Sequence, residues 1–449
     1  MNKIFNKTKW KKITATVLIF QLLHMFLLSS FFQTHHVQAQ TDITVVSDEL
    51  KSAVLMDAMT GQILYAKNAD AALPPASMSK MMTEYLLLES VANGQLAWEQ
   101  TITISKYASD MIGSGQQLAE GRQYTVKDVY RQLAIYSGND ASIALAEAIA
   151  GTEEQFVNMM NSKAKELGLS DQTYFANSTG LNNSELREYS ALAPNVPNVP
   201  GETLLTANDA ALLARNLIVD FPEVLETTSI TEANVVESDP TSLKMVNWNW
   251  MLEGWKEYNN NFTEFAYEGL DGLKTGHTDE AGYCFTGTAE RDGMRLISVV
   301  MGAGSEPERF RETKKLLDYG FNNFEKKTIV KAKSTLEQLT EVEIKKGVET
   351  KVPVVTETSI TLLVGKQFDE ATDVTIEAVA LPEDIVAPIE TGQKVGTVTV
   401  KYTSPSGEIV ETVNLIAEEE VEKAGWFRLF LRAIKNFFVD IFEGVKNLF

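Results

Sequence analysis

The 449-residue sequence predicts a mixed α/β (α+β) fold in which helices flank an antiparallel sheet, followed by a small all-β domain and a C-terminal amphipathic helix. Three observations predict this order. Strand-like runs stand at both ends of a helical middle within residues 45–325, which is typical of one sheet covered by helices. Short alternating runs rich in Thr, Val, Glu and Lys fill residues 326–420, which indicates sheet. Apolar residues then recur at helical spacing within residues 421–449.

The elements of the first region follow from local signals. Residues 52–67 predict a hairpin, and Pro74-Pro75 ends it before a largely apolar helix whose first turn holds Ser77. Further helices are expected at 126–136, 141–150, 153–167, 206–219 and 306–319, with a Pro-rich surface loop at 193–201. Strands are expected at 269–275, 282–289 and 294–301, the last two joined by a turn at 291–293.

The N-terminus predicts a secretory signal peptide over residues 1–39. A lysine-rich start precedes an apolar run from 13 to 32, and Val37-Gln38-Ala39 has small residues at the spacing of a cleavage site. An uncleaved anchor helix is the alternative, but polar residues such as Gln21 and His24 interrupt the run. Cleavage after Ala39 would remove five lysines and no acid from a chain whose net charge is already −21. A mature chain this acidic repels nucleic acid, so no nucleic-acid partner is expected.

The chain has few residues for disulfide or metal chemistry. Cys284 is the only cysteine, so an exported chain carries no intramolecular disulfide and depends on packed cores. Of four histidines, three lie within residues 1–39, which leaves His277. A histidine-based metal site is therefore not expected, and neither a metal nor a cofactor is predicted.

The C-terminal segment from 426 to 449 predicts an amphipathic helix. Its apolar face is made of Phe427, Phe430, Leu431, Ile434, Phe438, Ile441, Phe442, Val445 and Phe449. The segment contains too many charges to span a bilayer, and it suits a helix lying in the membrane interface with basic groups near anionic headgroups. A helix that packs on its own domain is the alternative. The predicted location is outside the cytoplasm, on the outer face of the cytoplasmic membrane.

Three short polar motifs occur in a fixed order: Ser77-Met78-Ser79-Lys80, Ser137-Gly138-Asn139 and Lys274-Thr275-Gly276. Together they supply what serine acyl transfer without histidine requires. Ser77 and Lys80 share a helix face, so Ser77 is the expected nucleophile and Lys80 its base. Burial and a nearby Lys274 would both disfavour the ammonium form of Lys80.

The other motif residues have expected roles in the same reaction. Ser137 would relay the proton to the leaving amine, and Asn139 would hold Lys80 and the substrate amide. Lys274 and Thr275 would bind a substrate carboxylate. The oxyanion needs two backbone donors, for which the N–H groups of Ser77 and His277 are expected. A catalytic role for the His277 side chain is the less favoured alternative.

The stretches Pro75–Lys80, Ser137–Ser142, Asp271–Thr278 and Met294–Gly302 carry a family resemblance. Residues 45–325 resemble the low-molecular-mass penicillin-binding proteins, the serine-type D-alanyl-D-alanine carboxypeptidases, with the β domain and terminal helix in that family's usual places. The resemblance implies a beta-lactamase/transpeptidase-like fold and removal of the terminal D-alanine from peptidoglycan pentapeptides through an acyl-enzyme on Ser77. Beta-lactams would acylate the same serine. Arg309 corresponds to the family's further carboxylate-binding arginine.

Several alternatives stay open at this point. A class A beta-lactamase needs a glutamate to activate the deacylating water, and Glu185 and Glu188 lack the expected flanking pattern. A D,D-endopeptidase that cleaves cross-links shares every motif. A non-catalytic, membrane-attached wall-binding or drug-sensing protein should lack a motif member, and none is missing. The segment 185–265, with Trp248, Trp250 and Trp255, follows no family pattern and is a candidate rim of the cleft.

Overall fold

The computed structural model describes residues 44–115, 118–258, 261–381, 384–404 and 407–446. The predicted signal peptide, residues 1–39, lies outside the described residues, as does its cleavage site. The final residues of the predicted terminal helix, 447–449, lie outside them as well.

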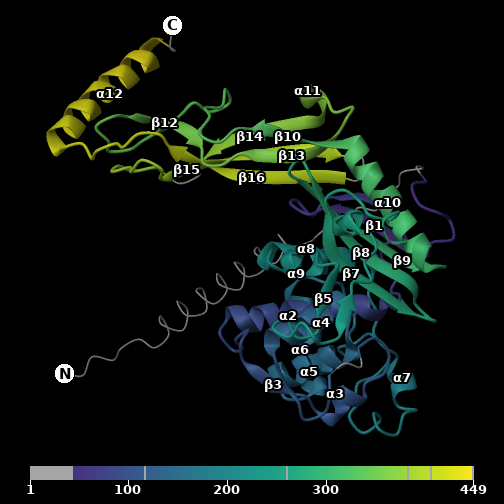
Figure 1. The fold of residues 1–449 in the computed structure, drawn as a ribbon. Coiled ribbons are helices and arrows are strands. Elements are labelled where there is room, and N and C mark those ends of the chain that lie inside the picture. The colour runs from purple at the N-terminus through teal and green to yellow at the C-terminus, as the bar shows by residue number, and fades with distance from the viewer. Residues whose placement is uncertain (1–43, 116–117, 259–260, 382–383, 405–406, 447–449) are drawn as a thin grey trace, which may run out of the picture. The chain divides into compact units, whose positions relative to one another are not determined.

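A five-stranded antiparallel sheet in the order β2-β1-β9-β8-β7 organises the first region (Figure 1). Its strands are β1 (Ser52–Asp57), β2 (Ile63–Lys67), β7 (Leu270–Thr278), β8 (Gly282–Arg291) and β9 (Met294–Ala303). β1 pairs with β9, with Leu55 opposite Ser298, so the first hairpin joins strands from the far end of the region. The prediction of one sheet built from both ends of residues 45–325 is confirmed. The strand order places β7 at an edge of the sheet.

Helices cover both faces of this sheet because successive strand residues point to opposite sides. Val299 packs in one core with α2 (Lys80–Ala92) and α8 (Ala207–Asp220). Its neighbour Val300 packs in a second core with Phe310 of α10 (Glu306–Asn323). The remaining elements of the helical middle are η2 (Ala76–Ser79), β3 (Thr101–Thr103), α3 (Lys106–Asp110), β4 (Gln123–Thr125), α4 (Val126–Tyr136), α5 (Asn139–Ala150), α6 (Glu153–Glu166), α7 (Asn183–Leu186), α9 (Val224–Thr228), β5 (Glu232–Asn234), β6 (Lys244–Val246) and η3 (Glu253–Glu257).

Several element boundaries differ from the predicted ones, and three of the differences involve a motif. Ser77 lies in the 3-10 turn η2, which runs directly into α2, rather than in the first α-helical turn. Asn139 is the first residue of α5 instead of a loop residue. β7 continues to Thr278, so Lys274 lies inside the strand and not at its end. The pairing of β7 with β8 continues from Lys274 through Thr278, and local propensity does not reveal such pairing.

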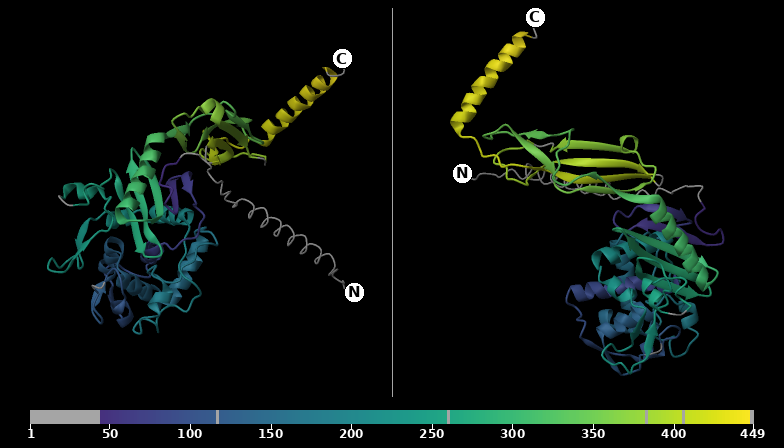
Figure 2. Two further views of the ribbon diagram at one scale, coloured as in Figure 1. Left: turned by 90° about the vertical axis from the view of Figure 1, so that its right-hand side faces the viewer. Right: turned by 45° about the horizontal axis from the view of Figure 1, so that its top comes forward.

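The following β region has two antiparallel sheets, as expected of a small sandwich (Figures 1 and 2). One pairs β10 (Phe324–Val330) with β13 (Ile360–Gly365), and the other has the order β11-β12-β16-β15-β14. The second sheet consists of β11 (Glu341–Glu343), β12 (Lys351–Thr356), β14 (Val374–Ala380), β15 (Lys394–Ser404) and β16 (Gly407–Ala417), and the short α11 (Glu370–Asp373) precedes β14. Leu362 and Val400 belong to one buried cluster shared by the two sheets.

The chain then forms α12 (Trp426–Lys446), which is amphipathic as predicted. Its exposed apolar side chains include Trp426, Phe427, Phe430, Leu431, Ile434, Phe437, Phe438 and Ile441. Within residues 44–446, apart from the short gaps given above, the structure has no helix that is both long and apolar enough to span a bilayer.

Candidate active site

Ser77 and Lys80 lie where η2 meets α2. Ser77 is half-buried, whereas the Lys80 side chain is fully buried. The Lys80 Nζ atom lies 2.8 Å from Ser77 Oγ. The three-residue spacing therefore brings the two groups together as predicted, because side chains three apart on a helical turn lie on one face.

The Lys80 amine has two further oxygen partners. Its Nζ atom lies 2.7 Å from Asn139 Oδ1 and 2.8 Å from the Thr179 carbonyl oxygen. A neutral amine has two N–H donors and one lone pair. Donation to Asn139 and Thr179 leaves that lone pair facing the Ser77 hydroxyl, which is the arrangement that a general base requires.

The environment of Lys80 favours this neutral form. Burial lowers the pKa of the Lys80 ammonium well below its ordinary value, and the nearby charge of Lys274 lowers it further. Nearby acidic side chains, of which Asp140 has the largest effect, oppose the shift. The sequence-based expectation that burial and a second lysine act together on Lys80 agrees with this environment.

The Thr179 carbonyl is a part of the site that the sequence did not indicate. Its loop is shaped by Asn177, whose Oδ1 accepts from the Thr179 N–H at 3.0 Å and from the Gly180 N–H at 2.7 Å. Glu153 holds the same loop by accepting from the N–H and the hydroxyl of Ser178, each at 2.8 Å. The available signal was the polar run 177–180 between two helices, which is typical of a turn.

Ser137 and Asn139 lie at the junction of α4 and α5. Ser137 adopts a left-handed conformation at φ 63° and ends α4, and its Oγ accepts from Lys274 Nζ at 2.8 Å. Asn139 donates from Nδ2 to the Ile112 carbonyl at 2.7 Å, which turns its Oδ1 toward Lys80. The structure thus brings all three motifs together through two contacts, from Asn139 to Lys80 and from Ser137 to Lys274.

Lys274 and Thr275 lie side by side on the edge strand β7, and both are buried. Lys274 Nζ donates to the Thr275 carbonyl at 3.0 Å as well as to Ser137. Burial lowers the pKa of Lys274 to about 8, an effect that Glu84 opposes and Arg309 increases. At neutral pH Lys274 is therefore mostly protonated, as an anchor for a carboxylate must be.

Gly276 allows β7 to approach the Ser77 backbone closely. A Cβ atom added at Gly276 would lie 2.6 Å from the Pro75 carbonyl oxygen and 3.1 Å from the Ser77 nitrogen. The next residue, His277, is exposed, and its ring stacks on Tyr283 with centroids 4.0 Å apart. Its predicted contribution, a backbone N–H for the oxyanion, stays a prediction.

Arg309 lies beside β7 on α10. It is 2% exposed, and it donates to the Gly276 carbonyl at 3.3 Å and to Glu306 Oε1 at 2.7 Å. Burial lowers its pKa to about 10, so it remains charged at neutral pH. Arg309 is therefore next to the Lys-Thr-Gly motif, where its charge acts on Lys274, while its predicted role in binding a carboxylate stays a prediction.

Glu84 is a buried acid that the sequence interpretation overlooked. It lies one turn after Lys80 on α2, is fully buried, and has no hydrogen-bond partner for either carboxyl oxygen in the described part of the chain. Burial raises its pKa to about 7, although the charges of Lys274 and Lys80 oppose the shift. The pKa of Tyr130 on α4 is raised mainly by burial, and the nearby charge of Glu84 raises it further. The signal was an acid flanked by apolar residues in the middle of a largely apolar helix.

The residues that alternative reactions would use are not arranged for catalysis, as the sequence led us to expect. Burial raises the pKa of the Cys284 thiol to about 11, which makes a thiolate nucleophile unfavourable. Glu185 and Glu188 are exposed at α7 and just after it, so neither is buried in the manner of the motif residues. No group of His, Cys, Asp and Glu in the described residues could hold a metal ion.

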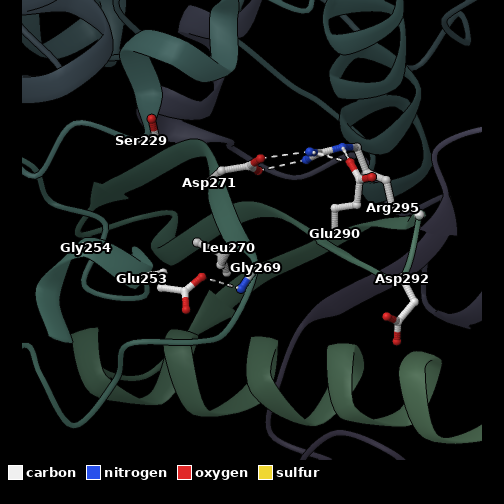
Figure 3. Close-up of a pocket in the computed structure, with 10 residues that line it drawn as sticks. Ser229, Glu253, Gly254, Gly269, Leu270, Asp271, Glu290, Asp292 and Arg295 are labelled. Atoms are coloured by element: carbon white, nitrogen blue, oxygen red, sulfur yellow. Dashed lines mark hydrogen bonds and ion pairs between the residues drawn. The ribbon is translucent and has the colours of Figure 1, made fainter.

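A cavity of about 500 Å³ lies elsewhere, at the beginning of β7 (Figure 3). Three of its four acidic side chains have structural partners: Arg295 binds Asp271 and Glu290, and Glu253 accepts from the Gly269 N–H at 2.9 Å. None of the motif residues lines it. The Arg295–Asp271 pair fixes the start of the strand that carries Lys274.

Comparison with known proteins identifies the family of the chain. A family model described as D-alanyl-D-alanine carboxypeptidase matches residues 37–305, and one described as penicillin-binding protein 5, C-terminal domain, matches residues 324–423. The chain is 34% identical over 424 residues to D-alanyl-D-alanine carboxypeptidase DacF of Bacillus subtilis (strain 168), covering 94% of this chain and 98% of that protein.

Two solved structures extend the comparison to the fold. A peptidoglycan synthesis regulatory factor (PBP3) from Streptococcus pneumoniae is 32% identical with a TM-score of 0.69, covering 83% of this chain and 99% of that one. Penicillin-binding protein D2 from Listeria monocytogenes, in its cefotaxime-bound form, is 34% identical with a TM-score of 0.51, covering 63% of this chain and 100% of that one. With its serine–lysine site and these matches along most of its length, the chain belongs to the D-alanyl-D-alanine carboxypeptidase family of serine hydrolases.

Proposed function

We propose that the enzyme removes the terminal D-alanine from peptidoglycan stem pentapeptides through an acyl-enzyme on Ser77. The observation that carries this proposal is the buried Lys80 amine, whose Nζ lies 2.8 Å from Ser77 Oγ. Lys80, Ser137 and Asn139 complete the catalytic group. Lys274, Thr275, Gly276, His277 and Arg309 form the substrate-binding edge along β7.

The reaction has two balanced steps. Ser77 Oγ attacks the carbonyl carbon of the D-alanyl-D-alanine bond while its proton passes to Lys80 Nζ. The proton then passes through Ser137 to the leaving nitrogen, the C–N bond breaks, and D-alanine departs with its carboxylate released from Lys274 and Thr275. Water next attacks the ester carbonyl, gives a proton to the same base, and Ser77 regains its hydroxyl hydrogen as the shortened peptide leaves.

Beta-lactams fit the same chemistry, because their strained amide presents a carbonyl to Ser77 and their separate carboxylate can bind Lys274. The cefotaxime-bound form of the Listeria relative supports this extension. The ring opens as the serine ester forms, and the amine remains attached, so it blocks the leaving-group side of the site. We infer that these drugs acylate Ser77.

We infer that residues 1–39 are a signal peptide, that 45–325 form the peptidase domain, that 326–420 are a spacer, and that 421–449 attach the enzyme to the membrane. An extracytoplasmic site of action fits a family of penicillin-binding proteins. Attachment to the outer face of the cytoplasmic membrane is supported by the exposed aromatic side chains of α12, such as Trp426, Phe427 and Phe430. A chain ending after Glu420 should keep peptidase activity and lose sedimentation with anionic vesicles. Unchanged sedimentation would contradict the attachment.

The test of the peptidase proposal combines intact mass with product analysis. The wild-type protein should gain one penicillin adduct and release D-alanine from a pentapeptide, whereas Ser77→Ala should do neither. A wild-type protein that forms no adduct and releases no D-alanine would overturn the proposal. Rapid loss of the adduct without D-alanine release would instead indicate a beta-lactamase.

A further inference from the structure

The three tryptophans of the segment 185–265 have different environments. Trp255 is fully buried, and Trp250 stacks on Phe262 with centroids 4.9 Å apart and lies 5.3 Å from the ring of Phe310. These two build the core beneath α10. Trp248 is 41% exposed, so packing in the core does not account for its large apolar side chain.

Trp248 is held firmly at the junction of α4 and β7. Its Nε1 donates to the Tyr136 carbonyl at 3.1 Å, and the two rings lie 5.7 Å apart. Its neighbours are both buried: Asn247 donates to the Ile230 carbonyl at 2.9 Å, and Asn249 donates to the Gly272 carbonyl at 3.3 Å. An exposed aromatic fixed from both sides is preorganised for binding.

Two residues that hold the Trp248 segment in place, Tyr136 and Gly272, are close in sequence to Ser137 and Lys274, which contact each other. Tyr136 directly precedes Ser137, and Gly272 lies two residues before Lys274 on β7. Ser137 Oγ and Lys274 Nζ are 2.8 Å apart. In the proposed reaction these two groups meet the leaving nitrogen and the terminal carboxylate. The Tyr136–Trp248 pair therefore borders the place of the departing amino acid.

We propose that Tyr136 and Trp248 form a wall of the leaving-group subsite and favour release of a single small D-amino acid over cleavage of cross-links. This inference rests on the proposed roles of Ser137 and Lys274. In cross-link cleavage the same C–N bond breaks, but the departing amine belongs to a second stem peptide and needs more room. A rigid aromatic wall packs against the D-alanine methyl group and obstructs the larger group, so it acts by both attraction and exclusion.

The experiment compares two substrates on full-length variants. Trp248→Ala should raise the ratio of cross-link cleavage to D-alanine release about tenfold, measured as kcat/KM on a cross-linked peptide dimer and on a pentapeptide. Trp248→Phe should stay near the wild-type ratio because it keeps a ring. Leu243→Ala, which removes a 66% exposed apolar side chain from the same segment, should leave the ratio unchanged.

Two measurements separate the possible failures. Penicillin acylation of each variant, with its melting temperature, shows whether the Ser77 site is folded; if Trp248→Ala does not fold, Trp248→Leu replaces it. An unchanged ratio in a variant that still acylates and releases D-alanine would overturn the wall and leave the proposed function intact. A wild-type protein that neither reacts with penicillin nor releases D-alanine would overturn the proposed function itself.

Discussion

Lys80 Nζ lies 2.8 Å from Ser77 Oγ, and the lysine side chain is fully buried beside it. Hydrogen bonds to Asn139 Oδ1 and the Thr179 carbonyl fix the direction of the amine. A lysine in water would be protonated at neutral pH and could not take the serine proton. Burial thus favours the neutral form that Lys80 needs for its proposed role as the base.

Replacing Lys80 by Met should remove the base while keeping a side chain of similar length. Acylation of Ser77 by penicillin should slow by about 10²- to 10⁴-fold, which is the usual contribution of a general base. Stopped-flow or gel labelling with a fluorescent penicillin measures the rate, and circular dichroism checks the fold. Lys106→Met, at a side chain that is 67% exposed, is the matched control and should label like the wild type. Labelling of Lys80→Met within tenfold of the wild type would argue against this role.

The pH profile should have an alkaline limit set by Lys274. Burial lowers its pKa to about 8, so its positive charge is present below that pH and is lost above it. The value of kcat/KM for the pentapeptide, which reports on the free enzyme, should therefore fall above about pH 8. In Lys274→Arg the charge persists at high pH, so any remaining activity should lack this fall. A profile that is flat to pH 10 in the wild type would contradict the assignment.

Glu84→Gln should shift that limit to lower pH. The Glu84 carboxylate raises the pKa of both Lys80 and Lys274, so neutralising it lowers both values. The alkaline fall should move down by about one unit, the size expected when a nearby opposite charge is lost. Glu89→Gln on the same helix, where Glu89 pairs with Lys163 at 2.7 Å, is the control and should keep the wild-type limit. An identical profile in Glu84→Gln would exclude this electrostatic role, even if its stability changed.

Gly180→Ala should damage both stability and acylation. Gly180 has φ +80°, and an added Cβ would lie 2.0 Å from the Ala76 carbonyl oxygen, directly beside Ser77. The free energy of unfolding should fall by at least about 1–3 kcal/mol, the combined range for backbone strain and overpacking. Gly168→Ala has a similar φ of +81° with no atom within 4 Å of the added Cβ, so it carries the strain alone. Equal melting temperatures and equal acylation rates in the two variants would contradict the close approach.

The catalytic residue types could be predicted because their arrangement is partly local. The spacing of Ser77 and Lys80 fixes their proximity within one turn, and near absence of histidine pointed to lysine as the base. The order of strands and helices also followed from periodicity, since both faces of the sheet had to be covered. Boundaries were less predictable: β7 continues through Thr278 because β8 pairs with it, and pairing is not a local property.

By itself, the sequence determined the spacing that predicts Ser77 as the nucleophile and Lys80 as its base, and it determined the amphipathic pattern of the chain's end, since these depend on positions within a few residues. Only the tertiary structure decided which distant groups complete the site. The Thr179 carbonyl reaches Lys80 because Asn177 and Glu153 shape its loop, and Glu84 acts on Lys274 across the packed core. The tertiary structure also distinguishes Trp248 from the two core tryptophans, because Trp248 is partly exposed and donates to the Tyr136 carbonyl. Such contacts form only when the sheet and helices pack together. The residues involved are separated by many different distances along the chain, so no sequence spacing predicts them.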